Sequence, residues 1–588
     1  MSVITTAQPH GGGLVDLLVS PERATELKKR AAEWPDWQLT RRQLCDLELL
    51  ACGGFSPLNS FLGEDDYLAV CQSMRLADGT LWPMPVTLDV PEEIAARAGS
   101  VGTLALRDAA GTLLAALHLT QAWVPDLQAE AMAVFGTTDT SHPGVEHLLR
   151  YTNPWYISGA LEVLQPPEHL DFLSHRHTPA QLRAEFAHRG WVRVVAFQTR
   201  NPMHRAHQEL TVRASLAEDA NLLIHPVVGV TKPGDIDPYT RVRCYRAILP
   251  SYPEGRVMLS LLPLAMRMGG PREALWHAII RKNYGATHFI VGRDHAGPGL
   301  DSGGRSFYGP YDAQELLNQH ATELAVRILP FRRMVYLADS GRYVPEDEAP
   351  PGARVLSISG TQVRRWLEEG RELPHWFSAP EIVTELRRSY PPNSARGFTV
   401  FFTGLPSAGK STIANALLAK LLERGGRQVT LLDGDMVRQH LSSELGFSRE
   451  HRDLNILRVG FVAAEITRHG GAAVCALIAP YEATRREVRR TITRHGGFVL
   501  VHVATPLNVC EKRDRKGLYD KARTGLLSNL TGLSDPYEEP PDADLVVDTA
   551  SEAPGQAAQR IIRYLQECGY LAPPSRDGLS DSYRRQPA

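Results

Sequence analysis

Gly404-Leu405-Pro406-Ser407-Ala408-Gly409-Lys410-Ser411 is the stretch that decides the fold of the C-terminal part of the chain. It fits the pattern G-x-x-x-x-G-K-[S/T], and it stands between an apolar run at 398–403 and a helical pattern at 412–422. In such a setting the loop backbone turns its N–H groups onto phosphate oxygens, Lys410 reaches the terminal phosphates, and the Ser411 hydroxyl is a ligand for Mg²⁺. An accidental glycine-rich turn would require neither flanking element. The stretch therefore predicts a P-loop that binds a nucleoside triphosphate through 404–412, Thr412 included.

Further apolar runs place this loop in a parallel sheet. Strands are expected at 398–403, 429–432, 473–478, 498–503 and 545–547, with helical stretches between them. Alternating strands and helices favour a doubly wound α/β fold. A Pro/Gly/Ser cluster at 390–397 is a poor helix or central strand and is interpreted as a linker.

The N-terminal part shows two different patterns of apolar and polar residues. Short apolar stretches punctuated by Gly, Pro and Asp, such as 84–90 and 102–107, predict a β-rich domain. From Trp191 onward, apolar runs at 192–197, 222–230, 257–262, 287–291 and 325–329 alternate with helical stretches and predict a second parallel sheet. The predicted domains are 1–171, 172–330, a small subdomain at 331–390, the linker at 391–397, and 398–572, followed by a disordered tail at 573–588.

Composition excludes several classes of function. The formal net charge of −2 gives no basic field for nucleic acid, and no run approaches the roughly 18 apolar residues of a membrane helix. The segment from Met1 to Ser20 has no cationic stretch before an apolar one, so we expect a cytoplasmic protein. The seven cysteines are scattered and never form a C-x-x-C pair, which argues against a disulfide framework.

A second constellation of polar residues follows the predicted strand at 192–197. It is Gln198-Thr199-Arg200-Asn201-Pro202-Met203-His204-Arg205-Ala206-His207. The two histidines are three apart and share one face near a helix N-terminus, where they can donate hydrogen bonds to phosphates. Arg200 offers a planar fork to an oxyanion, while Gln198 and Asn201 offer uncharged donors. Histidines at this spacing are also typical of a surface or of a partial zinc site, but no third ligand stands at a recognisable distance in the sequence.

A third polar segment follows the predicted strand at 287–291. It is Gly292-Arg293-Asp294-His295-Ala296. The carboxyl ends of parallel strands are where α/β sheets bind ligands. This segment is therefore expected to line the same site as Arg200 and the two histidines.

The C-terminal part resembles the adenylylsulfate (APS) kinases over about 397–570. The motifs of that family occur in order as 433–438, 445–448, 452–455, 478–481 and 516–523. The resemblance implies that APS is bound by Asp435, Arg438, Phe447, Arg452, Asn455 and Lys521, and that the basic segment 512–523 is a lid. Asp433 ends a strand beside the P-loop. There its carboxylate and the Ser411 hydroxyl can together hold Mg²⁺ or its hydration shell, or the carboxylate can accept the proton of an attacking hydroxyl. Lys410 and Asp433 are the expected catalytic residues.

One position departs from many relatives. They carry a serine, sometimes proposed to be phosphorylated, where this chain has Ala479. Alanine cannot carry phosphate, so we expect direct in-line transfer from ATP to the 3′-hydroxyl of APS.

The stretch from about 17 to 386 resembles ATP sulfurylases. The resemblance implies a PUA-like N-terminal domain, a Rossmann-like nucleotidyltransferase domain, and catalysis by Arg200, His204 and His207. Together the two resemblances imply a homo-oligomeric bifunctional enzyme of the PAPS synthase type, with Mg²⁺ as cofactor and ATP, sulfate, APS, PAPS and pyrophosphate as ligands. An alternative is an active APS kinase whose sulfurylase-like half is mainly an oligomerisation scaffold or an APS-binding regulator. A degenerate regulatory kinase is disfavoured by the intact Lys410, Ser411, Asp433 and Asp435.

Overall fold

The computed structural model describes residues 7–232, 234–514, 516–527 and 529–572. The predicted disordered tail at 573–588 lies outside these residues. By internal contacts the chain divides into two compact units, Met1–Ile358 with Pro374–Glu385, and Ser359–Leu373 with Leu386–Ala588. The domain boundaries given above stay predictions.

The first unit begins with a five-stranded sheet in the order β1-β3-β4-β5-β2. Its strands are β1 (Asp36–Gln38), β2 (Leu88–Val90), β3 (Thr103–Arg107), β4 (Leu113–Trp123) and β5 (Trp155–Val163). The helices of this region are α1 (Pro21–Arg30), α2 (Arg41–Ala51), α3 (Glu64–Ser73), α4 (Glu92–Val101), α5 (Leu127–Phe135) and α6 (Pro143–Tyr151). Local capping explains several of these helices; α2, for example, starts with a reciprocal capping box between Thr40 and Gln43.

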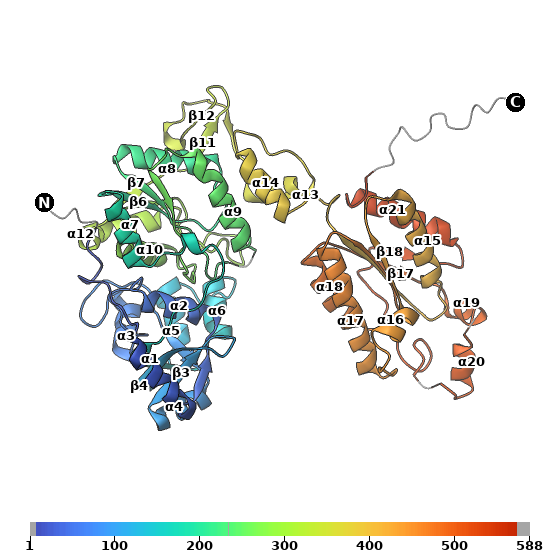
Figure 1. Ribbon diagram of the computed structural model, residues 1–588. Helices are drawn as coiled ribbons and strands as arrows, with labels where there is room; N and C mark the ends of the chain where they lie inside the picture. Colours follow the sequence, from blue (N-terminus) through green and yellow to red (C-terminus); the bar gives the residue numbers. More distant parts are fainter. Residues whose placement is uncertain (1–6, 233, 515, 528, 573–588) are drawn as a thin grey trace. The chain divides into compact units, whose positions relative to one another are not determined.

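The second sheet of this unit is entirely parallel and has the order β10-β9-β6-β7-β8. Its strands are β6 (Val194–Phe197), β7 (Asn221–Ile224), β8 (Val257–Leu259), β9 (His288–Val291) and β10 (Arg327–Pro330). Its helices are α7 (Pro179–His188), α8 (Arg205–Ala217), α9 (Pro238–Ile248), α10 (Gly270–Asn283), α11 (Asp312–Gln319) and α12 (Ala321–Leu324), and a small sheet follows with β11 (Met334–Leu337), β12 (Arg342–Pro345) and β13 (Val355–Leu356). The parallel sheet predicted for this region is confirmed (Figure 1).

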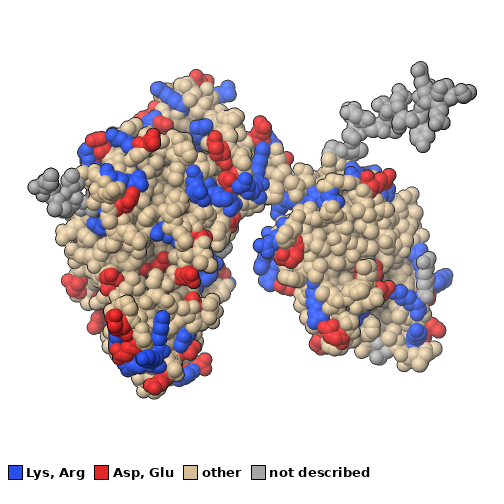
Figure 2. All heavy atoms as spheres, in the orientation of Figure 1, with Lys and Arg blue, Asp and Glu red and all other residues tan. Residues whose placement is uncertain are grey.

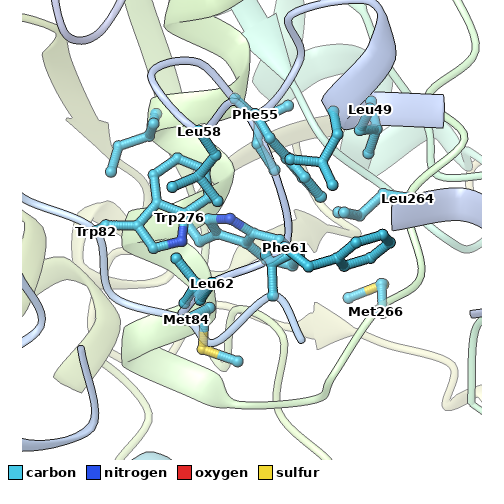
Figure 3. Close-up of a cluster of buried hydrophobic side chains, with 14 of the residues drawn as sticks. Leu49, Phe55, Leu58, Phe61, Leu62, Trp82, Met84, Leu264, Met266 and Trp276 are labelled. Carbon is cyan, nitrogen blue, oxygen red and sulfur yellow. The ribbon is translucent and has the colours of Figure 1, made fainter. Parts of the chain in front are cut away.

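A continuous aromatic core joins these two sheet regions. Trp276 of α10 lies 5.0 Å from Phe55 and 6.5 Å from Trp82, ring centroid to ring centroid, and all three are fully buried (Figure 3). The guanidinium of Arg267 packs over Trp276 and pairs with Asp46 at 2.6 Å. Because the buried ion pair and the aromatic cluster come from both regions, α10 is fixed from the N-terminal side.

The second unit is a parallel sheet with the order β15-β16-β14-β17-β18. Its strands are β14 (Phe398–Gly404), β15 (Val429–Asp433), β16 (Ala472–Ala476), β17 (Gly497–Val503) and β18 (Leu545–Val547). Its helices are α13 (Gly360–Glu368), α15 (Lys410–Arg424), α16 (Gly434–His440), α17 (Arg449–Arg468), α18 (Glu482–Thr493), α19 (Leu507–Lys512), α20 (Leu518–Arg523) and α21 (Pro554–Glu567), while α14 (Pro380–Ser389) begins in the first unit and ends in the second. All five strands predicted here are present.

Charged residues of both signs are interspersed on the visible face of each unit (Figure 2). Local placement of cations therefore matters more than an overall field. No helix within the described ranges is long and apolar enough to cross a membrane.

Candidate active sites

The P-loop joins the end of β14 to the start of α15, as its pattern predicts. Gly409 is the N-cap of α15 with φ 101°, a left-handed conformation that a glycine adopts without strain. Nζ of Lys410 donates to the carbonyls of Gly404 at 3.0 Å and Leu405 at 2.7 Å. Burial lowers the pKa of Lys410 to about 8, even though Asp433 acts in the opposite direction. The ammonium thus rests on the loop's own carbonyls, within reach of any phosphate that the loop binds.

Two oxygen donors stand together at the mouth of this loop. The Ser411 hydroxyl donates to Oδ2 of Asp433 at 2.5 Å, while Oδ1 of Asp433 accepts the N–H of Asp435 and caps α16. A hydroxyl and a carboxylate are hard ligands that suit Mg²⁺, which takes its remaining ligands from phosphate and water. Within the described residues, no group of three or more His, Cys, Asp and Glu side chains is arranged to hold a metal ion. The pair fits a Mg²⁺ that arrives with a nucleotide.

An aromatic ring and a cation face each other near α16. The guanidinium of Arg438 lies 4.3 Å from the ring centroid of Phe447, and it donates to the carbonyls of Leu445 and Gly446. Phe447 is 56% exposed, unusual for a phenylalanine with no function at a surface. The exposed ring of Phe447 offers a face on which an adenine can stack.

The other predicted APS-binding residues differ in their present contacts. Arg452 is buried and bound to Asp535, Thr531 and the carbonyl of Asn529, so its guanidinium holds the segment 529–535. Asn455 is also buried, and its Oδ1 has no partner among the described residues. Asp435 pairs with Lys516 of the predicted lid, and Lys521 is exposed on α20. These residues lie on α16, α17 and α20.

Ala479 lies after β16 and is 1% exposed. Its φ of 43° is left-handed, and its carbonyl accepts hydrogen bonds from Thr403 and Arg485. Held in this way, the methyl group occupies a place where a serine would present a hydroxyl.

The loop after β6 carries Arg200, which is paired with a carboxylate that the sequence did not suggest. Nη1 of Arg200 lies 3.2 Å from Oδ2 of Asp235, and the side chains are 18% and 13% exposed. Thr199 fixes the loop by exchanging hydrogen bonds with the backbone of Asn201. Gln198 donates to the sulfur of Met266 at 3.8 Å. Arg200 is thus accessible at one edge, and Asp235 is its counter-ion.

The two predicted histidines lie at the start of α8 as neutral rings. Burial lowers the pKa of His204 to about 3 and that of His207 to about 4. Nδ1 of His207 accepts the backbone N–H of His204 at 3.2 Å, so its proton is assigned to Nε2, which is then a donor. His204 is held by Ser378, whose Oγ lies 3.0 Å from Nδ1, and by the ring of Phe377 at 4.4 Å.

The segment after β9 reaches the same neighbourhood. Arg200 donates to the carbonyl of Gly297 at 3.4 Å, which links the second and third polar segments. Asp294 and Ala296 have φ values of 53° and 54°, and a Cβ on Gly297 would lie 2.0 Å from Oδ1 of Asp294. Gly292 is half-buried, Arg293 is exposed, and Nε2 of His295 lies 3.1 Å from Nδ1 of His277. The strained turn brings the segment against the Arg200 loop.

Sequence reasoning missed three residues of this site. Asp235, Phe377 and Ser378 contact Arg200 or His204, yet they stand 35 to 174 positions away and belong to no recognisable motif. No signal in a single sequence marks them.

Three family models match the chain. They are the PUA-like domain over 7–166, ATP-sulfurylase over 174–389 and adenylylsulphate kinase over 396–548. Curated relatives named sulfate adenylyltransferase, from Phaeosphaeria nodorum and Neurospora crassa, are each 53% identical, covering 96% of this chain and 99% of theirs. A solved structure titled "Hexameric APS kinase from Thiobacillus denitrificans" aligns with a TM-score of 0.79 at 38% identity, covering 96% of this chain and 99% of that one. The chain therefore belongs to the ATP sulfurylase (sulfate adenylyltransferase) family, in the form that carries a C-terminal APS kinase domain.

Proposed function

We propose that both units turn over, so that the chain converts sulfate and ATP first to APS and pyrophosphate, and then APS and a second ATP to PAPS and ADP. The observation that carries this proposal is that one chain retains two sets of phosphate-binding groups, around Arg200 and around Lys410, each on a loop at the carboxyl end of a parallel strand.

In the first reaction a sulfate oxygen attacks the α-phosphorus of ATP, and the bond to pyrophosphate breaks. Sulfate is already ionised, so no side chain has to act as a nucleophile, and the residues position the substrates and neutralise charge. Arg200 binds sulfate by exchanging its contact with Asp235 for the anion. The Nε2–H of His207, and His204 beside it, donate to ATP phosphates. Gln198, Thr199, Asn201 and the segment 292–296 complete the site.

In the second reaction the 3′-hydroxyl of APS attacks the γ-phosphorus of ATP, and the bond between that phosphorus and the bridging oxygen breaks to release ADP. Lys410 leaves the carbonyls of Gly404 and Leu405 and follows the charge of the transferred group. Asp433 accepts the proton of the hydroxyl or orders the hydration of the metal. Mg²⁺ would be held by Ser411 and Asp433, directly or through water, and would neutralise the β- and γ-phosphates. APS is bound by Phe447, Arg438, Asp435, Arg452, Asn455 and Lys521. Because Ala479 cannot be phosphorylated, the phosphoryl group passes directly from ATP to APS.

The two reactions support each other energetically. The phosphosulfate anhydride is a high-energy bond, so APS accumulates poorly from the first step alone. A fused kinase that consumes APS draws that equilibrium forward. We further propose that the protein is cytoplasmic and homo-oligomeric, the latter because the full-length structural neighbour is titled hexameric.

A second candidate function follows from that neighbour. Its title names APS kinase alone although it aligns with almost the whole chain. The N-terminal unit of this chain would then be a scaffold or an APS-binding regulator.

Two assays on the purified chain decide between these functions. ATP formation from APS and pyrophosphate measures the first unit, and PAPS formation from APS and ATP measures the second. Both activities are expected. A folded chain that makes PAPS but no ATP would favour the scaffold, and one that makes neither would refute the proposal.

A further inference from the structure

One face of the buried helix α10 carries a row of three ionisable residues. Glu273, His277 and Arg281 follow one another at four-residue spacing, and each is 0% exposed. Oε1 of Glu273 accepts the N–H of Arg267 at 2.9 Å, and Oε2 accepts the N–H of Gly269 at 2.8 Å. Burial opposes ionisation of Glu273, but His277 and these two N–H groups bring its pKa below the ordinary value. The carboxylate is therefore charged and fixed in place.

This carboxylate sets the protonation of the next ring. Nε2 of His277 lies 3.3 Å from Oε1 of Glu273, an ionic-distance contact without hydrogen-bond alignment, and its Nδ1 lies 3.1 Å from Nε2 of His295. Burial lowers the pKa of His277 despite Glu273, and burial together with His277, Arg281 and Arg200 lowers that of His295. Both rings are thus neutral, and each carries one proton.

One arrangement of the two protons avoids a lone pair of His277 facing the carboxylate of Glu273. If Nε2 of His277 were unprotonated, its lone pair would face the carboxylate of Glu273, and the two acceptors would repel each other. This nitrogen therefore carries the proton. Nδ1 of His277 is then an acceptor, and Nε2 of His295 must be the donor at 3.1 Å. The remaining nitrogen of His295, Nδ1, carries a lone pair. The tautomers are assigned from this network.

We propose that His277, oriented by Glu273, is a positioning residue of the sulfurylase site that holds His295 as its Nε2–H tautomer. This inference rests on the function proposed above. His295 then offers an acceptor to an N–H or O–H group of the adenosine moiety, and not a donor to a phosphate or sulfate oxygen. Arg200, which donates to Gly297 in the same turn, supplies the positive charge for the anions.

The chain allows a matched pair of variants. In His277→Asn the amide oxygen can still accept from Nε2–H of His295, whereas His277→Leu has similar bulk and no acceptor. We expect His277→Asn to keep the rate of ATP formation from APS and pyrophosphate within about threefold, and His277→Leu to lose about tenfold or more in kcat/KM, largely through KM for APS. Thermal melting shows whether each variant is folded.

A second measurement does not depend on activity. Ring-¹⁵N histidine spectra of the full chain, with His295 assigned by its loss in His295→Asn, report which nitrogen carries the proton. The wild type should show Nε2–H alone, with and without APS, and His277→Leu should show Nδ1–H as well. An Nδ1–H tautomer in the wild type, an imidazolium on APS binding, or equal losses in Asn and Leu variants would overturn the positioning role. Absence of ATP formation by the folded wild type would instead overturn the proposed function, and the positioning role with it.

Discussion

The two proposed nucleotide sites hold the groups assigned to phosphate in different ways. At the P-loop the cation is a lysine that rests on two carbonyls and is free to turn toward a phosphate. At the start of α8 the corresponding groups are imidazoles whose pKa values of about 3 and about 4 leave them neutral. The histidines therefore contribute hydrogen bonds and no charge. Positive charge at the proposed sulfurylase site must therefore come from groups such as Arg200, and at the kinase site Lys410 supplies it.

Removing Arg200 should have the largest effect. Arg200→Ala is expected to abolish ATP formation from APS and pyrophosphate, a loss of more than about 10³-fold, because the variant lacks the guanidinium that pairs with Asp235 and is assigned to sulfate. Kinase turnover should stay within about twofold, since the sites belong to different units. Parallel loss of both activities in a folded protein would show that the sites are not independent.

The corresponding experiment in the kinase unit replaces Lys410. Lys410→Ala should lower kcat for PAPS formation by more than about 10²-fold, because the β,γ-phosphates lose their fixed cation during transfer. ATP formation by the other unit serves as the internal control. Near-normal PAPS formation would refute the assignment of this loop.

The neutral state of the histidines is tested at His207. Its assigned Nε2–H is reproduced by the amide N–H of glutamine, so His207→Gln should keep most of the sulfurylase activity, while His207→Ala should lose about 10- to 100-fold. A loss in His207→Gln as large as in the alanine variant would indicate that a positive charge, and not a hydrogen bond, is required.

The two sites should also respond differently to pH. The pKa of Lys410 is about 8, so the free lysine loses its proton as the pH rises through 8 and binds phosphate less well above that value. Affinity of the kinase site for a non-hydrolysable ATP analogue should fall by up to about tenfold between pH 7.5 and 9. Inhibition of PAPS formation by the analogue at each pH reports this site alone, because only the second unit makes PAPS, and a flat profile would contradict the assigned shift.

The smallest effect is expected at Ala479. If transfer is direct, Ala479→Ser should change kcat for PAPS formation by less than about twofold, because Lys410 and Asp433 already supply charge and position. Initial-rate kinetics of the wild type should be sequential. A phosphoenzyme formed by the wild type in the absence of APS, or ping-pong kinetics, would show that another residue carries the phosphoryl group.

The sequence predicted those features that are set by interactions between residues close together in the chain. The P-loop and all five strands of its sheet were found because glycine spacing and apolar runs are local signals, and β18 coincides with the predicted 545–547. The parallel sheet around β6 was found for the same reason. The individual helices α1 to α6 were not predicted, since short helices set by caps such as Thr40 are weakly periodic.

The candidate sites could be predicted only in part. Their motif residues come from single loops, whereas the counter-ion Asp235 and the support Ser378 reach the sites from distant elements. Arg452 shows a further limit. The sequence indicates a basic residue for an anion, but only the structure shows it bound to Asp535.

The path of the chain limits how the protein can be divided into separate fragments. The backbone passes between the units three times, at 358/359, 373/374 and 385/386. A fragment that stops before 374 lacks Phe377 and Ser378, which support His204, and a fragment that starts after 385 lacks α13. No single cut separates complete halves, so gene fission at one point would leave each product missing a piece carried by the other.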